Sequence, residues 1–213
     1  MTKPIVINGL FVPDSAITHS ACKLVRELHS PALLNHVHRT WWFADLIGQK
    51  RGLKYDRELV YLAALLHDLG LTGQNETDKR FEVDGANAAR EFLAKHRYPQ
   101  ETASLVWDAI ALHTSAGIAD HKQPEVALVH FGAFADVFGM NLQELTPLFV
   151  EEVLEHYPRL GMKQAFVETL AALVKRKPHT AIGTGLADIG RRHVHNFNCP
   201  SLCDMIEHAP FSS

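Results

Sequence analysis

The chain has 213 residues, of which 46% are apolar, and a formal net charge of -3. These values exclude a disordered protein and allow a large buried core. Without a basic stretch there is no electrostatic basis for binding nucleic acid. No apolar run is long enough for a membrane helix, and three cysteines are too few for a disulfide framework. We therefore expect a cytoplasmic protein without a nucleic-acid or membrane partner.

The first element expected is a short strand or hairpin within residues 4–12, where Asn8-Gly9 between apolar residues indicates a tight turn. Helical patterns follow, with Ser30 as a typical N-cap before a proline and Gly70 as a C-terminal glycine. The expected helices cover about residues 15–29, 31–48, 57–70, 82–96, 99–113, 124–140, 145–157 and 163–175. The tail after them is less regular. No repeat, low-complexity tract or linker divides the chain, so the sequence predicts one all-α domain.

Four of the expected helices carry an imidazole or a carboxylate on a face that is otherwise apolar. These residues are His36, His67 with the adjoining Asp68, His113 and Asp136. An unpaired buried charge is costly, and a metal ion is one of the few partners that neutralise it. One such residue alone is more often a hydrogen-bonded core side chain. Several that converge favour a metal site.

His36, the pair His67-Asp68 and Asp136, in this order on successive helices, resemble the H…HD…D metal set of the HD-domain superfamily. The resemblance implies an HD-type helical bundle in which these four residues hold one divalent cation. Two imidazoles and two carboxylates suit Zn²⁺, and Fe²⁺ or Mn²⁺ would also tolerate them. A metal held there lowers the pKa of a bound water and so supplies a hydroxide nucleophile at ordinary pH.

The resemblance covers about residues 30–140, and the flanking segments are compatible with it, so we expect a single HD domain over residues 1–213. The metal-binding core is expected at about residues 30–140, and a C-terminal helical extension at about residues 141–213.

Two departures argue against the phosphohydrolase members of this superfamily. In many of them a lysine follows the glycine after the His-Asp pair, whereas Leu71 stands at that position here. The stretch 81–87, where two-metal members carry a further histidine, offers carboxylates but no imidazole. Such a site is poorly equipped to stabilise a multiply charged phosphoryl group.

Several segments instead resemble the cyanamide hydratase-like branch. They are Asn35-His36, residues 66–72, residues 80–89, residues 112–114 and, more loosely, the ending 203–211. This resemblance implies a zinc-dependent enzyme that adds water across the carbon–nitrogen triple bond of a small nitrile such as cyanamide, giving urea.

Within that hypothesis His113, together with Asp68, forms the catalytic pair, with His113 orienting the nucleophile or protonating the product nitrogen. The residues expected to bind or support the substrate are Asn35, Thr114, Glu82 and Asp84. An alternative interpretation is purely structural, because Asn and Thr satisfy helix ends and acids are favoured in the first turn of a helix.

Three further alternatives remain open at this point. The chain could be a phosphohydrolase acting on a nucleotide or other phosphate ester, or a metal-binding regulatory protein without turnover. His193, His195, Cys199 and Cys203 could form a second zinc site, although their spacing is not that of a familiar finger. Apolar helical surface in the C-terminal third is compatible with a homo-oligomer. Arg39 is expected to pair with an acid near the helix bundle.

Overall fold

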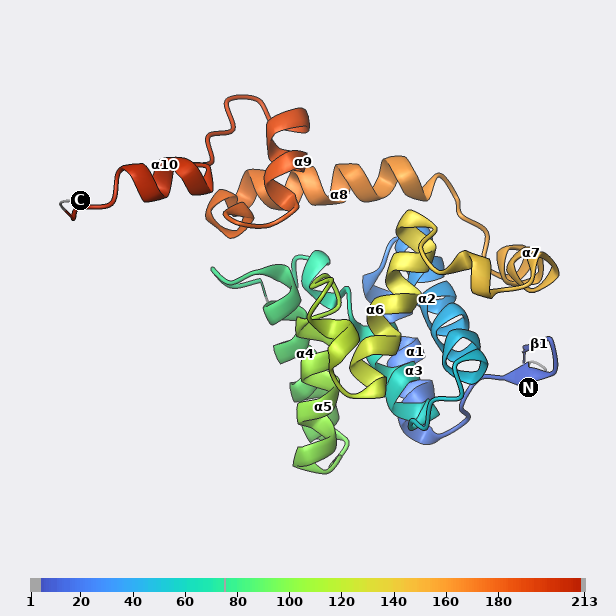
Figure 1. Cartoon of the computed structure of the whole chain (residues 1–213). Helices are drawn as coiled ribbons and strands as arrows, with labels where there is room; N and C mark the ends of the chain where they lie inside the picture. Colours follow the sequence, from blue (N-terminus) through green and yellow to red (C-terminus); the bar gives the residue numbers. More distant parts are fainter. Residues whose placement is uncertain (1–4, 75, 212–213) are drawn as a thin grey trace. The chain divides into compact units, whose positions relative to one another are not determined.

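Within residues 5–74 and 76–211, which the computed structural model describes, the chain folds into helices and one small hairpin (Figure 1). The helices are α1 (Ala16–Leu28), α2 (Pro31–Lys50), α3 (Arg57–Leu66), α4 (Phe81–Lys95), α5 (Gln100–Ala111), α6 (Pro124–Phe138), α7 (Pro147–His156), α8 (Met162–Arg176), α9 (Leu186–His193) and α10 (Leu202–Glu207). The other elements are the strands β1 (Val6–Ile7) and β2 (Leu10–Phe11) and the 3-10 turns η1 (Leu69–Leu71), η2 (Ala119–His121), η3 (Leu142–Glu144) and η4 (Pro178–Ala181). The predicted all-α fold is confirmed.

The predicted hairpin is also present. β1 pairs antiparallel with β2, with Ile7 opposite Leu10. Asn8 and Gly9 both have positive φ angles, of 50° and 73°, as a two-residue turn of type I′ requires. Pro4, at the start of the predicted segment, lies outside the described residues.

The first three helices each begin after a capping side chain, and Ser30 is the cap that the sequence predicts. The side chains of Ser15, Ser30 and Asp56 accept hydrogen bonds from backbone N–H groups of the first turns of α1, α2 and α3. Each cap satisfies a donor that has no partner inside its helix. Apart from α3, the predicted helices end within two residues of the observed bounds. α9 and α10 lie in the C-terminal tail, where the helical sequence pattern is less regular.

The prediction for the end of the third helix is wrong. α3 ends at Leu66 rather than at Gly70, and η1 follows after a two-residue turn. A Cβ atom added to Gly70 would overlap the backbone oxygen of Phe81 and lie 2.9 Å from the backbone nitrogen of Gly85. The glycine is therefore needed for the close approach of η1 to α4, not to cap α3. This turn places His67 and Asp68 just beyond the end of the helix.

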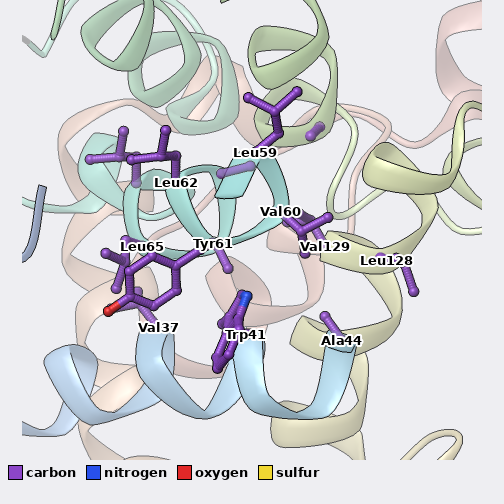
Figure 2. Packing of buried hydrophobic residues seen from close by; sticks show 14 of the residues in the cluster. Val37, Trp41, Ala44, Leu59, Val60, Tyr61, Leu62, Leu65, Leu128 and Val129 are labelled. Carbon is purple, nitrogen blue, oxygen red and sulfur yellow. The ribbon is translucent and has the colours of Figure 1, made fainter. Parts of the chain in front are cut away.

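Helices α2, α3 and α6 pack together through a core of buried hydrophobic residues (Figure 2). Trp41 of α2 points toward α3, where Tyr61 contacts its ring edge-on with ring centroids 5.1 Å apart. Val129 of α6 completes the packing and, like Trp41, has no exposed surface. Burial of one such large side chain contributes about 1.5–3 kcal/mol. This core fixes the three helices that carry most of the predicted metal ligands.

By their internal contacts, the residues divide into two compact units. The first comprises Met1–Glu76 with Phe81–Met162, and the second comprises Thr77–Arg80 with Lys163–Ser213. All predicted site residues belong to the first unit. The expected single HD domain, with a core at about 30–140, stays a prediction. No described helix is both long and apolar enough to cross a membrane.

α2 and α6 approach each other closely at Gly132, where an added Cβ would overlap the backbone oxygen of Thr40 and lie 2.9 Å from the Cβ of Ala44. We expect Gly132→Ala to push α6 away from α2 and to lower the free energy of unfolding by about 1–3 kcal/mol, as overpacking does. Urea denaturation monitored by tryptophan fluorescence measures the change. Gly185→Ala is the control, because its added Cβ meets no atom within 4 Å; equal stability of the two variants would contradict the close approach.

Candidate metal centre

Three of the predicted ligands come together at the ends of two helices. His36 lies in the second turn of α2, His67 is the C-cap of α3, and Asp68 follows in the turn before η1. Each side chain is only 1% exposed. One ligand atom from each can be chosen so that all lie within 4.8 Å of one another. Such a buried group of imidazoles and a carboxylate is a candidate site for a divalent cation.

The distances show how tightly the polar atoms converge. The Nε2 atoms of His36 and His67 are 3.2 Å apart, and they lie 3.4 Å and 3.3 Å, respectively, from Asp68 Oδ2. His113 approaches from the other side, with its Nε2 3.8 Å from Asp68 Oδ1. Three imidazoles therefore surround one carboxylate.

Local hydrogen bonds fix which nitrogen of each ring faces the cluster. His67 Nδ1 lies 2.7 Å from the carbonyl oxygen of Ala64, and His113 Nδ1 lies 2.6 Å from that of Ile110. A carbonyl oxygen only accepts hydrogen bonds, so both Nδ1 atoms must donate. In their neutral forms the two rings consequently present the lone pairs of Nε2 to Asp68, which is the arrangement of metal-binding histidines.

The surroundings of the Asp68 carboxylate show whether the site is suited to a metal ion. Both its carboxylate oxygens are buried, and neither has a hydrogen-bond partner within the described part of the chain. The facing lone pairs of His36 and His67 would also repel one another unless a proton or a cation lies between them. A divalent cation satisfies the carboxylate and both lone pairs at once, so His36, His67 and Asp68 fit a metal.

The buried His67, Asp68 and His113 shift one another's pKa values. Burial acts against protonation of His67, but the Asp68 carboxylate, together with the Ala64 carbonyl oxygen and Asp136, outweighs it and raises the pKa of His67. Burial acts to raise the pKa of Asp68, but the adjoining His67, with His36 and His113, holds it below its usual range. Burial, followed by the nearby His67, lowers the pKa of His113 to about 4.

The fourth predicted ligand, Asp136 in α6, is not part of the group of three. Its Oδ2 lies 2.7 Å from His36 Nδ1, the nitrogen opposite to the one that faces His67. Arg39 donates from Nε to Oδ1 at 2.7 Å and from Nη2 to Oδ2 at 2.8 Å, which confirms its predicted pairing with an acid. Asp136 thereby orients His36 from behind, as carboxylates behind metal-binding histidines do. Its predicted role as a direct ligand stays a prediction.

The remaining predicted site residues fall into two places. Thr114 follows His113 in the sequence, and its hydroxyl donates a hydrogen bond to Glu82 Oε1 at 2.7 Å. Glu82 and Asp84 are each only 2% exposed. Asn35 is half-buried next to His36, and its Nδ2 donates to the Pro158 carbonyl oxygen at 2.8 Å. The first group lies on the His113 side of the site, and Asn35 connects α2 to the segment after α7.

Sequence patterns missed two residues that hold the site together. Arg159 donates from Nη1 to Oδ1 of Asp136 at 2.8 Å and to its backbone oxygen at 3.0 Å. His130 Nδ1 donates to the His113 carbonyl oxygen at 2.8 Å. Arg159 lies in a loop without periodicity, so no pattern could reveal it. His130 lies on an apolar helix, which is a weak signal by itself.

Within the described part of the chain, the histidines and cysteines of the possible second zinc site do not gather in the same way. Among the described residues, His193, His195, Cys199 and Cys203 form no group of three close ligands. Cys203 is exposed and Cys199 is partly exposed.

Comparisons with known proteins identify the family of the chain. The model of the family described as HD domain matches residues 33–145, more than half of the chain and the part that holds all four predicted ligands. An uncharacterized protein of Clostridium beijerinckii is 30% identical over 70 residues, which cover 33% of this chain and 45% of that protein. The cyanamide hydratases DDI2 and DDI3 of Saccharomyces cerevisiae are each 27% identical over 163 residues, covering 73% of this chain and 72% of each relative. The resemblance stated from the sequence is confirmed.

Asp68 and Asp136 differ in their contacts, so their amide variants should differ too. We expect Asp68→Asn to abolish stoichiometric metal binding, because it removes the charge at the centre of the imidazoles. Asp136→Asn should keep one metal per chain and weaken its affinity about 10–100-fold, the usual effect of losing a carboxylate behind a metal-binding histidine. Elemental analysis and competition with a chelator measure both effects. Asp108→Asn, at a surface ion pair with Lys122, is the control; equal losses in the two site variants would instead make Asp136 a direct ligand.

Proposed function

The chain belongs to the HD domain family, and we propose that it is a metal-dependent hydratase that adds water to a small nitrile, converting cyanamide to urea. The observation that carries the proposal is the composition of the site. It combines a buried His-His-Asp group with a third imidazole, while the two arginines beside it, Arg39 and Arg159, both pair with Asp136. A neutral nitrile needs no cation to cradle phosphate. The similarity to two cyanamide hydratases supports the same choice.

In this proposal His36, His67 and Asp68 hold the metal, with Zn²⁺ first and Fe²⁺ or Mn²⁺ as alternatives. When bound, the metal supplies Lewis acidity, which brings the pKa of a water molecule toward neutrality. Asp136 contributes by keeping the proton of His36 on Nδ1, so that Nε2 offers its lone pair to the cluster.

His113 is the residue placed to move protons. Because its Nδ1 donates to the Ile110 carbonyl oxygen, the proton-accepting atom of the neutral ring is Nε2, which lies 3.8 Å from Asp68 Oδ1. Hydration joins the oxygen of water to the nitrile carbon and transfers one proton from water to the nitrile nitrogen. His113 Nε2 accepts that proton and returns it to the nitrogen, after which the product rearranges to urea.

The substrate contacts follow from the chemistry of cyanamide, whose amino group donates two hydrogen bonds. Thr114 and Glu82 form a hydrogen-bonded pair on the His113 side, and Asp84 is buried in the same first turn of α4. These residues supply oxygen acceptors. Asn35 uses Nδ2 on Pro158, which leaves its Oδ1 as a further acceptor. Oxygen acceptors of this kind suit the amino group of a small, uncharged substrate.

The direct test incubates the zinc-loaded protein with cyanamide and measures urea. We expect urea to form, and to disappear when a chelator removes the metal. Release of phosphate from nucleotides without urea would reject the proposal in favour of a phosphohydrolase. A full metal site with neither product would instead favour a regulatory protein without turnover.

The role of His113 gives a second prediction. We expect His113→Ala to lower kcat for cyanamide about 10²–10⁴-fold, the usual contribution of a positioned acid–base group, while one metal per chain is retained. Steady-state kinetics and elemental analysis of the same sample measure the two quantities. His121→Ala, at a side chain that is 80% exposed, is the matched control. Full turnover by His113→Ala would remove this residue from the mechanism.

A further inference from the structure

We propose that Arg159 is a positioning residue of the metal centre: it fastens the segment after α7 to the carboxylate that orients His36. The inference rests on the metal-binding part of the proposed function and not on the identity of the substrate. It concerns a residue outside residues 33–145, the range that matches the HD domain.

Hydrogen bonds connect the partly exposed Arg159 through Asp136 to the metal ligand His36. Arg159 is about one-third exposed, whereas the side chain of Asp136 has no exposed surface. One nitrogen of Arg159, Nη1, contacts both Oδ1 and the backbone oxygen of Asp136, at 2.8 Å and 3.0 Å. The other oxygen of the same carboxylate lies 2.7 Å from His36 Nδ1. Arg159 is thus separated from a metal ligand by a single side chain.

The segment 157–159 is attached at two more points. Arg39 donates from Nη1 to the carbonyl oxygens of Tyr157 and Pro158, at 3.0 Å and 3.3 Å. Asn35, the neighbour of His36, donates to the Pro158 carbonyl oxygen at 2.8 Å. Arg39 therefore binds the segment and Asp136 at once, and Arg159 binds Asp136 from the segment itself. These attachments cover the buried pair of Asp136 and His36 on this side.

Arg39 and Arg159 hold Asp136 in different ways. Arg39 uses Nε and Nη2 on the two carboxylate oxygens, which needs the planar fork of a guanidinium. Arg159 places one nitrogen between two oxygens, which the ammonium of a lysine can also do. A lysine should therefore replace Arg159 but not Arg39.

Two opposite effects follow from removing the Arg159 charge. The loss of one contact leaves Asp136 and the 157–159 segment less constrained, which weakens the orientation of His36 and lowers metal affinity. The loss of a positive charge removes a repulsion and would raise affinity. Because Arg159 is partly exposed and already paired with Asp136, its charge is largely compensated. The loss of orientation should dominate.

The test measures zinc affinity by chelator competition, without any substrate. Arg159→Met, which keeps the aliphatic stem, should bind zinc about 10–100-fold more weakly. Arg159→Lys should stay within about threefold of the unmodified chain, whereas Arg39→Lys should not. The control is Arg51→Met, which breaks an ion pair with Glu144 elsewhere in the first unit. Unchanged or tighter binding by Arg159→Met would overturn the proposal, as would equal losses in the Met and Lys variants of Arg159.

A second measurement uses the unmodified chain and does not depend on how the variants fold. The NMR signals of the Arg159 guanidinium and of the His36 Nδ1 proton should both shift when zinc is added, whereas the Arg51 signal should not. An Arg159 signal that stays fixed while the His36 signal moves would refute the coupling. Because neither experiment involves cyanamide, failure to form urea would leave these results intact, and loss of the coupling would leave the hydration assay intact.

Discussion

Both carboxylate oxygens of Asp68 are buried, and within the described residues neither has a hydrogen-bond partner. The cost of burying such a group is large unless an opposite charge accompanies it. The rings of His36 and His67 face it, with their Nε2 atoms within 3.4 Å of one carboxylate oxygen, but a neutral ring offers only a lone pair there and cannot compensate the charge. A shared proton or, better, a divalent cation between these atoms would compensate it, and the hydrogen bonds made by Nδ1 of both rings leave Nε2 to face that position.

The rest of the first unit serves to hold this group in place. The apolar core of α2, α3 and α6 fixes the helices, and the close approach of η1 to α4 at Gly70 sets the turn that carries Asp68. Behind the ligands lies a second set of polar contacts, in which Asp136 joins His36 to two arginines. His36 is therefore supported by Asp136 and, through it, by Arg159, which lies beyond the segment that matches the HD domain.

Much of this could be predicted from the sequence, because long helices repeat their apolar residues and carry recognisable caps. The positions of His36, His67, Asp68 and His113 followed from polar residues on apolar helix faces. The end of α3 could not be predicted, since it depends on the approach of Phe81 to Gly70 across space. α9 and α10 are too short for a clear period. The contact of Asp136 with Arg159 could not be predicted either, because Arg159 lies in a loop that leaves no pattern in the chain.

X-ray absorption at the zinc edge of the loaded protein tests the central claim most directly, because it reports the atoms around the metal. The account predicts a first shell of nitrogen and oxygen only, with the outer-shell scattering typical of at least two imidazole rings. Sulfur at about 2.3 Å would instead place the metal on the cysteines, and a shell of oxygen without imidazole would place it on carboxylates alone. Either result would contradict a cation held by His36, His67 and Asp68.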